Sequence, residues 1–114
     1  MAWTAWRLLA KRSQWFDDNC DYDGATCYEL SIAGPRGGDR RCVYCGHSGD
    51  EKKRMSTYGR DGSHLAKIIR SHLRDGWALY YRGWCCDSKE DADAMERRML
   101  KNFDYPWNII LNQS

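Results

Sequence analysis

The sequence predicts an α+β fold in which a small sheet packs against helices. Residues 25–33, 40–44 and 77–84 are predicted strands, because they alternate polar and apolar side chains or are rich in aromatic residues, and they end at turn residues. Four other segments either repeat apolar residues at intervals of three and four or begin with a helix-capping signature. The expected order is helix, strand, strand, helix, helix, strand, helix.

The first 24 residues are predicted to be an N-terminal helical extension, with a helix over residues 1–16. The apolar side chains that share one face of this helix are Trp3, Trp6, Leu9 and Ala10. This face either packs on the rest of the protein or offers exposed aromatic rings to a partner subunit or to DNA. Residues 25–114 are predicted to form the main domain.

An antiparallel hairpin is the simplest arrangement for the first two strands. A segment of turn-forming residues, 34–39, separates residues 25–33 from residues 40–44. Tyr28 falls on the more apolar face of the first strand, and Tyr44 ends the second. The hairpin therefore carries one tyrosine on each strand.

Three helices are predicted after the hairpin, over about residues 50–58, 64–75 and 88–102. The first follows the candidate N-caps Ser48 and Asp50. The second stops at Gly76, and the third opens at Ser88 with a sequence that resembles a capping box. The third predicted strand lies between the last two helices, which places strands and helices in one mixed domain.

Composition fits one small domain with an uneven charge. The chain has 114 residues, of which 42% are hydrophobic, and a net charge of +2. Residues 36–82 hold eleven Lys and Arg against five Asp and Glu, so this middle block carries +6 between two acidic ends. A basic block suits a polyanion such as nucleic acid, although a solvated surface has the same composition.

The sequence also predicts an intracellular protein that does not enter a membrane. No apolar run approaches the ~20 residues of a membrane span. The N-terminal segment lacks the basic start and long apolar core of a signal peptide. In an intracellular setting the six cysteines are expected to be reduced thiols.

Three side chains around residues 44–58 suit a phosphate ester. Tyr44 ends a strand, whereas Arg54 and Tyr58 lie one turn apart on the following helix. An arginine can hold phosphate oxygens with two parallel hydrogen bonds, and a phenol can position or deprotonate a nucleophile. The spacing predicts that the three side chains converge.

This stretch resembles the signature of the GIY-YIG nuclease family. Tyr44-Cys45-Gly46 stands where the family has Tyr-Ile-Gly, whereas Thr26-Cys27-Tyr28 matches the Gly-Ile-Tyr half only at its tyrosine. The late helix supplies a glutamate, and an asparagine follows Pro106 as in the family. The matched positions are Tyr28, Tyr44, Arg54, Tyr58, Glu96 and Asn108, and the resemblance extends over about residues 25–112.

The resemblance implies a three-stranded antiparallel sheet flanked by helices and a metal-dependent DNA endonuclease. Glu96 is expected to bind one divalent ion, Mg²⁺ or Mn²⁺. Tyr28 is the expected general base, with Tyr44 as the alternative, and otherwise Tyr44 positions the water or the phosphate. Arg54 is expected to stabilise the phosphoryl charge. Tyr58 would orient the nucleophile and Asn108 the surroundings of Glu96.

DNA is the expected partner. Lys67, Arg70 and Arg74 follow one side of the second helix at helical spacing, as a candidate phosphate-binding stripe or a solvated face. His47 either reaches the scissile phosphate or is an ordinary loop histidine, and His64 would contact DNA or cap the helix. Low or short-sequence specificity is expected, with a phage or mobile-element origin. Cutting both strands would take a homodimer or two successive events.

Two alternatives remain open from the sequence. The first is a non-catalytic DNA-binding module with the same fold. The second is a zinc-ribbon interaction protein, because Cys42 and Cys45 form a CxxC followed by Gly46 and His47. The only other downstream pair is the adjacent Cys85 and Cys86, whose spacing is poor for chelation, so this alternative has less support.

Overall fold

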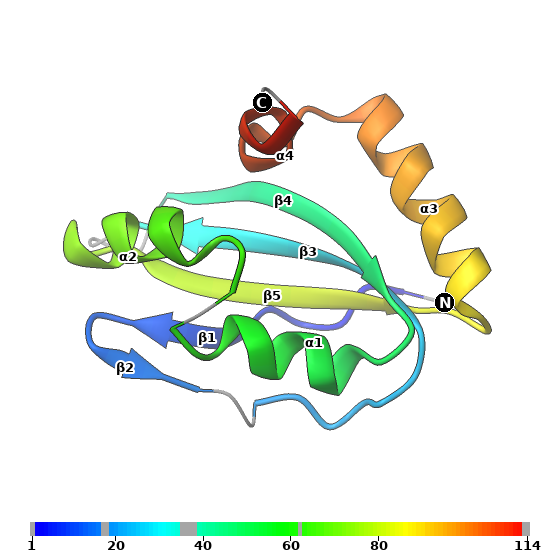
Figure 1. The fold of residues 1–114 in the computed structure, drawn as a ribbon, viewed down its shortest axis with the longest axis horizontal. Coiled ribbons are helices and arrows are strands. Elements are labelled where there is room, and N and C mark those ends of the chain that lie inside the picture. Colours follow the sequence, from blue (N-terminus) through cyan, green and yellow to red (C-terminus); the bar gives the residue numbers. More distant parts are fainter. Residues whose placement is uncertain (1, 17–18, 35–38, 62, 113–114) are drawn as a thin grey trace.

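A computed structural model describes residues 2–16, 19–34, 39–61 and 63–112, which form one antiparallel sheet and four helices (Figure 1). The strands are β1 (Arg7–Lys11), β2 (Gln14–Trp15), β3 (Thr26–Ala33), β4 (Arg40–Ser48) and β5 (Ala78–Cys85). The helices are α1 (Glu51–Tyr58), α2 (Ala66–Arg74), α3 (Lys89–Asn102) and α4 (Pro106–Asn112). The five strands lie in the order β2-β1-β5-β3-β4. The predicted α+β class is therefore confirmed, but the sheet has five strands where three were expected.

The predicted hairpin of β3 and β4 is confirmed. The two strands pair antiparallel from Thr26 opposite Ser48 to Ala33 opposite Arg40. A shift of register after Leu30 leaves one extra residue on β4. Residues 35–38 of the predicted turn lie outside the described residues. Strand β4 is longer than predicted, because pairing with β3 continues beyond Tyr44 to Ser48.

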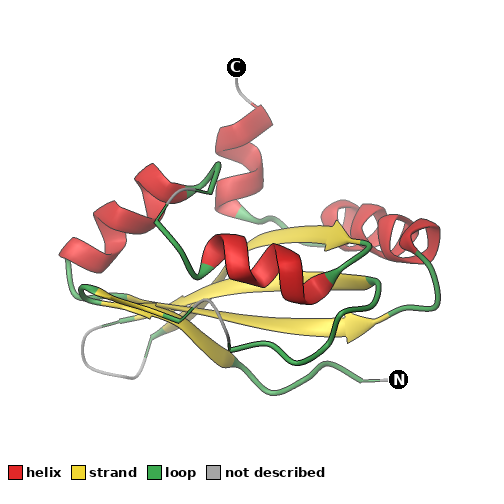
Figure 2. Cartoon of the chain, turned by 60° about the horizontal axis from the view of Figure 1, so that its bottom comes forward, coloured by secondary structure: helices red, strands yellow, loops and turns green. Residues whose placement is uncertain are grey.

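The first face of the sheet carries the main hydrophobic core. Alternate β3 residues, Tyr28, Leu30 and Ile32, point to this face and are almost completely buried. Helices α1 and α2 lie over it, as Figures 1 and 2 show. They contribute Met55 and Ile69, among other side chains, to the same cluster. These two helices therefore fix the surroundings of the predicted tyrosines.

The second face of the sheet is covered by a smaller apolar cluster and by a buried carboxylate with its hydrogen-bond partners. Cys27 and Cys45 form a smaller apolar cluster with side chains of α3. Next to it, the buried carboxylate of Glu29 accepts hydrogen bonds from Arg82 at 2.7 Å and from the Tyr105 hydroxyl at 2.6 Å. A buried charge of this kind is tolerated because its oxygens are fully partnered.

The predicted N-terminal helical extension is wrong. Residues 7–15 form the β1–β2 hairpin, and β1 pairs with β5 at the side of the sheet away from β3. A β-bulge between Leu8 and Ala10 buries the neighbouring Leu9 and Ala10 together. Two adjacent buried residues break the alternation typical of a strand, which is why the segment looked helical. The division of the chain at residue 24 stays a prediction.

The two tryptophans of the supposed helical face also have another role. The Arg82 guanidinium lies 4.7 Å from the ring centre of Trp3 and 4.6 Å from that of Trp6. Arg40 also lies over two rings, 5.0 Å from the ring centre of Trp6 and 4.3 Å from that of Tyr80. These cation–π contacts fasten the N-terminal segment to the second face of the sheet.

Two predicted helix caps are confirmed. Asp50 accepts a hydrogen bond from the Lys53 backbone N–H at the start of α1. Ser88 does the same for Asp91 at the start of α3. Helix α2 is two residues shorter at its start than predicted. Among the residues that the structure describes, no helix is both long and apolar enough to cross a membrane.

Candidate active site

Three tyrosines from three elements meet on the first face of the sheet. Tyr28 comes from β3, Tyr44 from β4 and Tyr58 from the end of α1. The hydroxyl oxygens of Tyr28 and Tyr58 lie 2.8 Å apart and share a hydrogen bond. The Tyr44 ring centre is 6.3 Å from that of Tyr28 and 6.4 Å from that of Tyr58. We refer to these three side chains as the tyrosine cluster.

Gly46 provides the space that the tyrosine cluster occupies. It is the register partner of Tyr28 across β3 and β4. A Cβ atom added at Gly46 would lie only 2.5 Å from the Tyr28 hydroxyl oxygen. Any side chain at this position would therefore displace the phenol, which gives a packing reason for a glycine two residues after Tyr44.

Arg54 supplies a positive charge next to these phenols. It lies one turn before Tyr58 on α1 and is half-buried. Burial by itself lowers the pKa of Arg54, but Tyr28 and Tyr58 beside it raise that pKa on balance. The guanidinium therefore stays charged at every pH at which the protein would act.

The three phenols are held in their neutral form. Burial raises the pKa of Tyr28 well above its ordinary value, and Tyr58 and Tyr44 add to the effect. Burial also raises the pKa of Tyr58 and of Tyr44. The positive charge of Arg54 opposes the rise at all three tyrosines without cancelling it. Deprotonating any of them requires either alkaline pH or an additional positive charge nearby.

A hollow of about 390 Å³ opens beside the tyrosine cluster. Its lining residues are Ser48, Asp50, Lys53, Arg54, Thr57, Tyr58 and His64. The imidazole Nε2 of His64 lies 3.4 Å from the Tyr44 hydroxyl. Burial and the charge of Arg54 lower the pKa of His64, so its ring is neutral at pH 7. The hollow thus combines two cationic side chains with a neutral imidazole and a phenol.

Glu96 belongs to a second group, formed with His47 and Asp93. The Nδ1 atom of His47 lies 3.2 Å from a carboxylate oxygen of Glu96 and 3.8 Å from one of Asp93. Asp93 and Glu96 stand three residues apart on α3 and so share one side of it. Sequence reasoning missed Asp93, although this spacing from Glu96 was visible. His47 contacts these carboxylates on the α3 side of β4, whereas it was predicted to reach the phosphate.

The His47–Asp93–Glu96 set fits a divalent ion. One ligand atom from each residue lies within 4.8 Å of the others, and all three side chains are only half-buried. Carboxylate oxygens are suitable ligands for Mg²⁺ and Mn²⁺, and an imidazole nitrogen favours Mn²⁺ of the two. Among the described residues, no group with metal-ligand geometry contains a cysteine.

Asn108 acts on the backbone of β4. Its Oδ1 accepts a hydrogen bond from the Cys45 N–H at 2.8 Å, and its Nδ2 donates one to the Cys45 carbonyl oxygen at 2.9 Å. Cys45 stands between Tyr44 and Gly46, so Asn108 fixes the strand at the place where the tyrosine cluster is attached. Its observed partner is therefore this backbone, whereas Glu96 or its surroundings were predicted.

The tyrosine cluster and the His47–Asp93–Glu96 set flank the same strand. Tyr44 leaves β4 toward the first face, and His47 leaves it toward α3. The two groups are close enough to interact electrostatically. Burial and the neighbouring Tyr58 are the main causes of the raised pKa of Tyr44, and the negative charge of Glu96 raises it further. The structure thus divides the predicted catalytic residues between the two sides of one strand.

The predicted stripe on α2 does not line the hollow at the tyrosine cluster. Arg70 forms an ion pair with Asp61, and Arg74 and Lys67 are exposed. Arg70 and Arg74 instead line a separate hollow on the other side of the loop between α1 and α2. The structure therefore separates the stripe from the candidate active site.

Comparison with known proteins agrees with this geometry. The chain matches the family model described as "GIY-YIG domain-containing protein" over residues 39–76 and 66–114. It is also 30% identical to Protein EFFECTOR OF TRANSCRIPTION 3 of Arabidopsis thaliana, over an alignment of 137 positions that covers 98% of this chain. Protein EFFECTOR OF TRANSCRIPTION 2 of the same plant is 29% identical over 85 positions, or 57% of this chain.

The relatives are longer proteins. The chain spans 52% of the first of these proteins and 18% of the second. No solved structure gives a significant match. The family model nevertheless extends over all of β4, over the four described helices and over β5. The chain is a member of the GIY-YIG domain family.

Proposed function

We propose that this protein is a metal-dependent endonuclease that hydrolyses phosphodiester bonds of DNA. The observation that carries the proposal is the meeting of Tyr28, Tyr44, Tyr58 and Arg54 beside a hollow, with the His47–Asp93–Glu96 set across one strand. Within the GIY-YIG family, phenols, an arginine and a carboxylate in these positions support phosphoryl transfer. Structural tyrosines of a core would not need a charged arginine packed against them.

Arg54 is proposed to bind the scissile phosphate. Among the described residues no carboxylate forms an ion pair with its guanidinium, so its charge is available to an anion in the hollow. The same charge would stabilise the extra negative charge that develops on the phosphoryl oxygens during attack. Lys53, which lines the same hollow, would add to the attraction for the DNA backbone.

The proton of the attacking water is proposed to pass to the tyrosine cluster. Tyr28 and Tyr58 are both fully buried, but of the two only Tyr58 lines the hollow. Water in the hollow would therefore meet Tyr58 first, and the 2.8 Å contact would relay a proton onto a Tyr28 phenolate. Tyr44, which is half-exposed and contacts His64, would position the phosphate or the water.

Glu96, Asp93 and His47 are proposed to hold one divalent ion, Mg²⁺ or Mn²⁺. An ion bound there would polarise the phosphoryl oxygens and stabilise the leaving 3′ oxygen. Asn108 would support this arrangement from a distance, by holding β4 in place at Cys45. One such site cuts one strand, so cutting both strands would take two copies of the chain or two successive events.

A second candidate function is DNA binding without cleavage. It is favoured by the names of the Arabidopsis relatives, which describe effectors of transcription, and by the raised pKa values of all three tyrosines. Either function would place the protein inside the cell, where DNA is found.

One experiment separates the two functions. Supercoiled plasmid is incubated with the protein and Mg²⁺ or Mn²⁺, and a parallel sample contains EDTA. Nicked or linear product that forms only with free metal supports the endonuclease. Retarded plasmid that stays intact in every sample, over a wide range of protein concentration, would leave the binding module as the function.

A further inference from the structure

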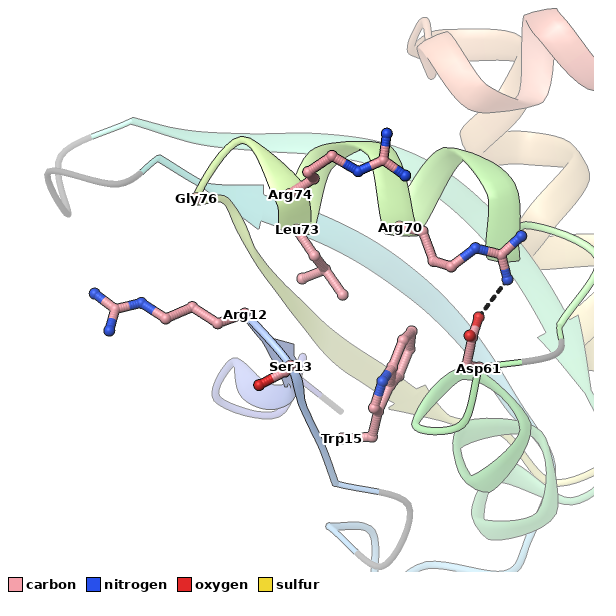
Figure 3. Close-up of a pocket in the computed structure, with 8 residues that line it drawn as sticks. All are labelled: Arg12, Ser13, Trp15, Asp61, Arg70, Leu73, Arg74 and Gly76. Atoms are coloured by element: carbon pink, nitrogen blue, oxygen red, sulfur yellow. Dashed lines mark hydrogen bonds and ion pairs between the residues drawn. The ribbon is translucent and has the colours of Figure 1, made fainter.

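A second and larger hollow lies between the β1–β2 hairpin and α2, as Figure 3 shows. Its volume is about 600 Å³, within the range of ~300–1,000 Å³ typical of ligand pockets. The residues that line it are Arg12, Ser13, Trp15, Asp61, Arg70, Leu73, Arg74 and Gly76. We call it the hairpin pocket. It shares no lining residue with the hollow at the tyrosine cluster.

The walls of the hairpin pocket are parts of the fold. Trp15 is paired with Ala10 in the sheet, and its indole packs against the main core. Leu73, on the opposite wall, is buried in the same core. Arg12 stands in the two-residue turn of the hairpin with a left-handed backbone, φ 56°. A wall anchored in the core at two points keeps its shape when a ligand enters.

The charge in the hairpin pocket is strongly positive. Three guanidiniums face a single carboxylate, Asp61, which is already paired with Arg70. Within the described part of the chain, Arg12 and Arg74 form no ion pair, and both are exposed. In Figure 3 the Leu73 side chain points toward the hairpin, whereas the Arg12 guanidinium extends outward from the turn and the Arg74 guanidinium lies on the outer side of α2, so both cations stand at the edges of the pocket. The pocket thus combines a flat aromatic ring with cations that are still available to an anion.

We propose that the hairpin pocket binds single-stranded DNA, with a base stacked on Trp15 and adjacent phosphates held by Arg12 and Arg74. Grooves for single-stranded nucleic acid combine aromatic platforms with a positive lining, because every base has a stacking face and every linkage has a charge. A base inside a duplex is already stacked between its neighbours. The phosphates of a duplex could therefore bind the arginines, but no base would stack on the Trp15 ring. Arg70, held by Asp61, would border the base.

This binding site goes beyond the proposed cleavage function and does not depend on it. The first half of the family signature corresponds to Thr26-Cys27-Tyr28, whereas Arg12, Ser13 and Trp15 come from the hairpin that precedes it. Helix α2 rises by about 12 Å over its nine residues, and its first turns lie near His64 at the other hollow. A single strand held in the hairpin pocket would therefore leave toward the tyrosine cluster along α2.

The test is fluorescence anisotropy of a labelled twelve-nucleotide oligo-dT strand, titrated with the 114-residue protein in EDTA at several salt concentrations. EDTA prevents cleavage, so the Kd reports binding alone. The main variant is Arg12→Ala/Arg74→Ala. Its matched control is Arg98→Ala/Lys101→Ala, which removes two exposed cations from α3 and changes the net charge equally.

The pocket variant should weaken Kd at least tenfold and reduce the slope of log Kd against log salt by about 1.4, because each lost phosphate contact to a single strand accounts for about 0.7. The control should change Kd by less than about twofold. Equal losses in both variants would mean that binding follows net charge, and an unchanged Kd in the pocket variant would remove the site altogether.

The aromatic part of the site has its own test. Trp15→Ala should weaken oligo-dT binding by about 5-fold to 100-fold, the usual effect of removing one stacking ring. Trp15→Phe keeps a ring and most of the core packing, so it should bind within a few-fold of the parent. If both variants keep their unfolding midpoint and bind like the parent, Trp15 does not stack.

A twelve-base-pair duplex is the last arm of the experiment. Duplex binding should be weaker and should not respond to Trp15→Ala. The proposal would be overturned if the duplex bound as tightly as the single strand and lost as much affinity in Arg12→Ala/Arg74→Ala. The pocket would then be a groove that binds the DNA phosphates without stacking a base. The outcome is separate from the proposed cleavage function, because a protein that never cuts plasmid can still pass this test and one that cuts can fail it.

Discussion

The two faces of the sheet use charge in opposite ways. On the second face the carboxylate of Glu29 is buried, but Arg82 and Tyr105 satisfy its oxygens. On the first face Arg54 lies among three neutral phenols and, among described residues, has no carboxylate partner. A closed network of opposite charges holds a fold together, whereas a cation surrounded by neutral groups remains ready for an anionic ligand. The comparison separates residues that stabilise from residues that are available for chemistry.

The largest effect is expected from the carboxylate at α3. Glu96→Gln should abolish plasmid cleavage while oligonucleotide binding and the unfolding midpoint stay unchanged, because the amide keeps the shape but loses the charge that attracts a cation. Glu90→Gln, on the same helix in its exposed first turn, is the matched control and should cut normally. The metal can be followed directly by calorimetric titration with Mn²⁺. Normal cleavage by Glu96→Gln at ordinary Mg²⁺ would remove this residue from the mechanism.

The next effect concerns the hydrogen-bonded tyrosine pair. Tyr28→Phe removes one hydroxyl and should slow single-turnover cleavage by about 10²–10⁴-fold, the usual contribution of positioned acid–base catalysis. Tyr58→Phe should lose a similar factor if the two hydroxyls relay one proton, and Tyr44→Phe should lose less. DNA affinity should barely change in any of them. A dead Tyr44→Phe together with an active Tyr28→Phe would move the base to Tyr44.

The same assay has a defined dependence on pH. Since burial raises the pKa of Tyr28 and of Tyr58, the phenolate fraction is small at pH 7 and grows with each step toward alkaline pH. The cleavage rate of the parent should therefore rise steadily between about pH 7 and pH 9.5. A rate that is flat over this range would show that no tyrosine of the cluster acts as the base.

For the Glu29 network on the second face, the expected effect is on stability alone. Glu29→Gln should lower the free energy of unfolding by about 2–3 kcal/mol, toward the low side of the range for breaking a buried ion pair, because Arg82 is partly exposed. Tyr105→Phe should cost about 1–2 kcal/mol, since it removes one hydrogen bond to a charged group. Urea unfolding curves give both values. A loss of cleavage in Glu29→Gln at full stability would contradict the purely structural role of Glu29.

The smallest effect is expected at Glu51, a buried carboxyl at the start of α1 on the first face. Burial raises its pKa, and hydrogen bonds from Cys20 and Thr26 only partly offset this. The folded state then binds the proton more tightly than the unfolded state, so stability falls as pH rises from the ordinary value of 4.5 toward the higher folded pKa. Glu51→Gln should remove this decline. The measurement is the urea midpoint at several pH values between 4 and 8, and an identical decline in the variant would contradict the assignment.

The sequence was most informative where local pattern and tertiary fold agree. The bounds of β3, α1, β5 and α3 follow from alternation, caps and turn residues, and these are the elements that place Tyr28, Arg54 and Glu96. The order of those residues along the chain was enough to predict the family, which the family model confirms. Their roles in catalysis remain predictions.

The misses have physical causes. The N-terminal segment was taken for a helix because its apolar residues, Trp3, Trp6, Leu9 and Ala10, stand at helical spacing. The β-bulge explains the last two, and stacking on Arg82, which belongs to a strand far away in sequence, explains the two tryptophans. The partners of Glu29 and His47 also come from distant segments. Local periodicity indicates which side chains share a face of one helix or strand. It does not indicate which residues from distant segments will contact that face.

The contact between Asn108 and Cys45 has a consequence for how the molecule meets other chains. Strand β4 is an outer strand of the sheet, and an outer strand with free N–H and C=O groups is a template on which another chain can add a strand. The Asn108 amide occupies both backbone groups of Cys45, in the manner of one residue of a neighbouring strand. Helix α4 thereby shields this part of the edge, so replacing Asn108 would free both backbone groups of Cys45 to pair with another chain.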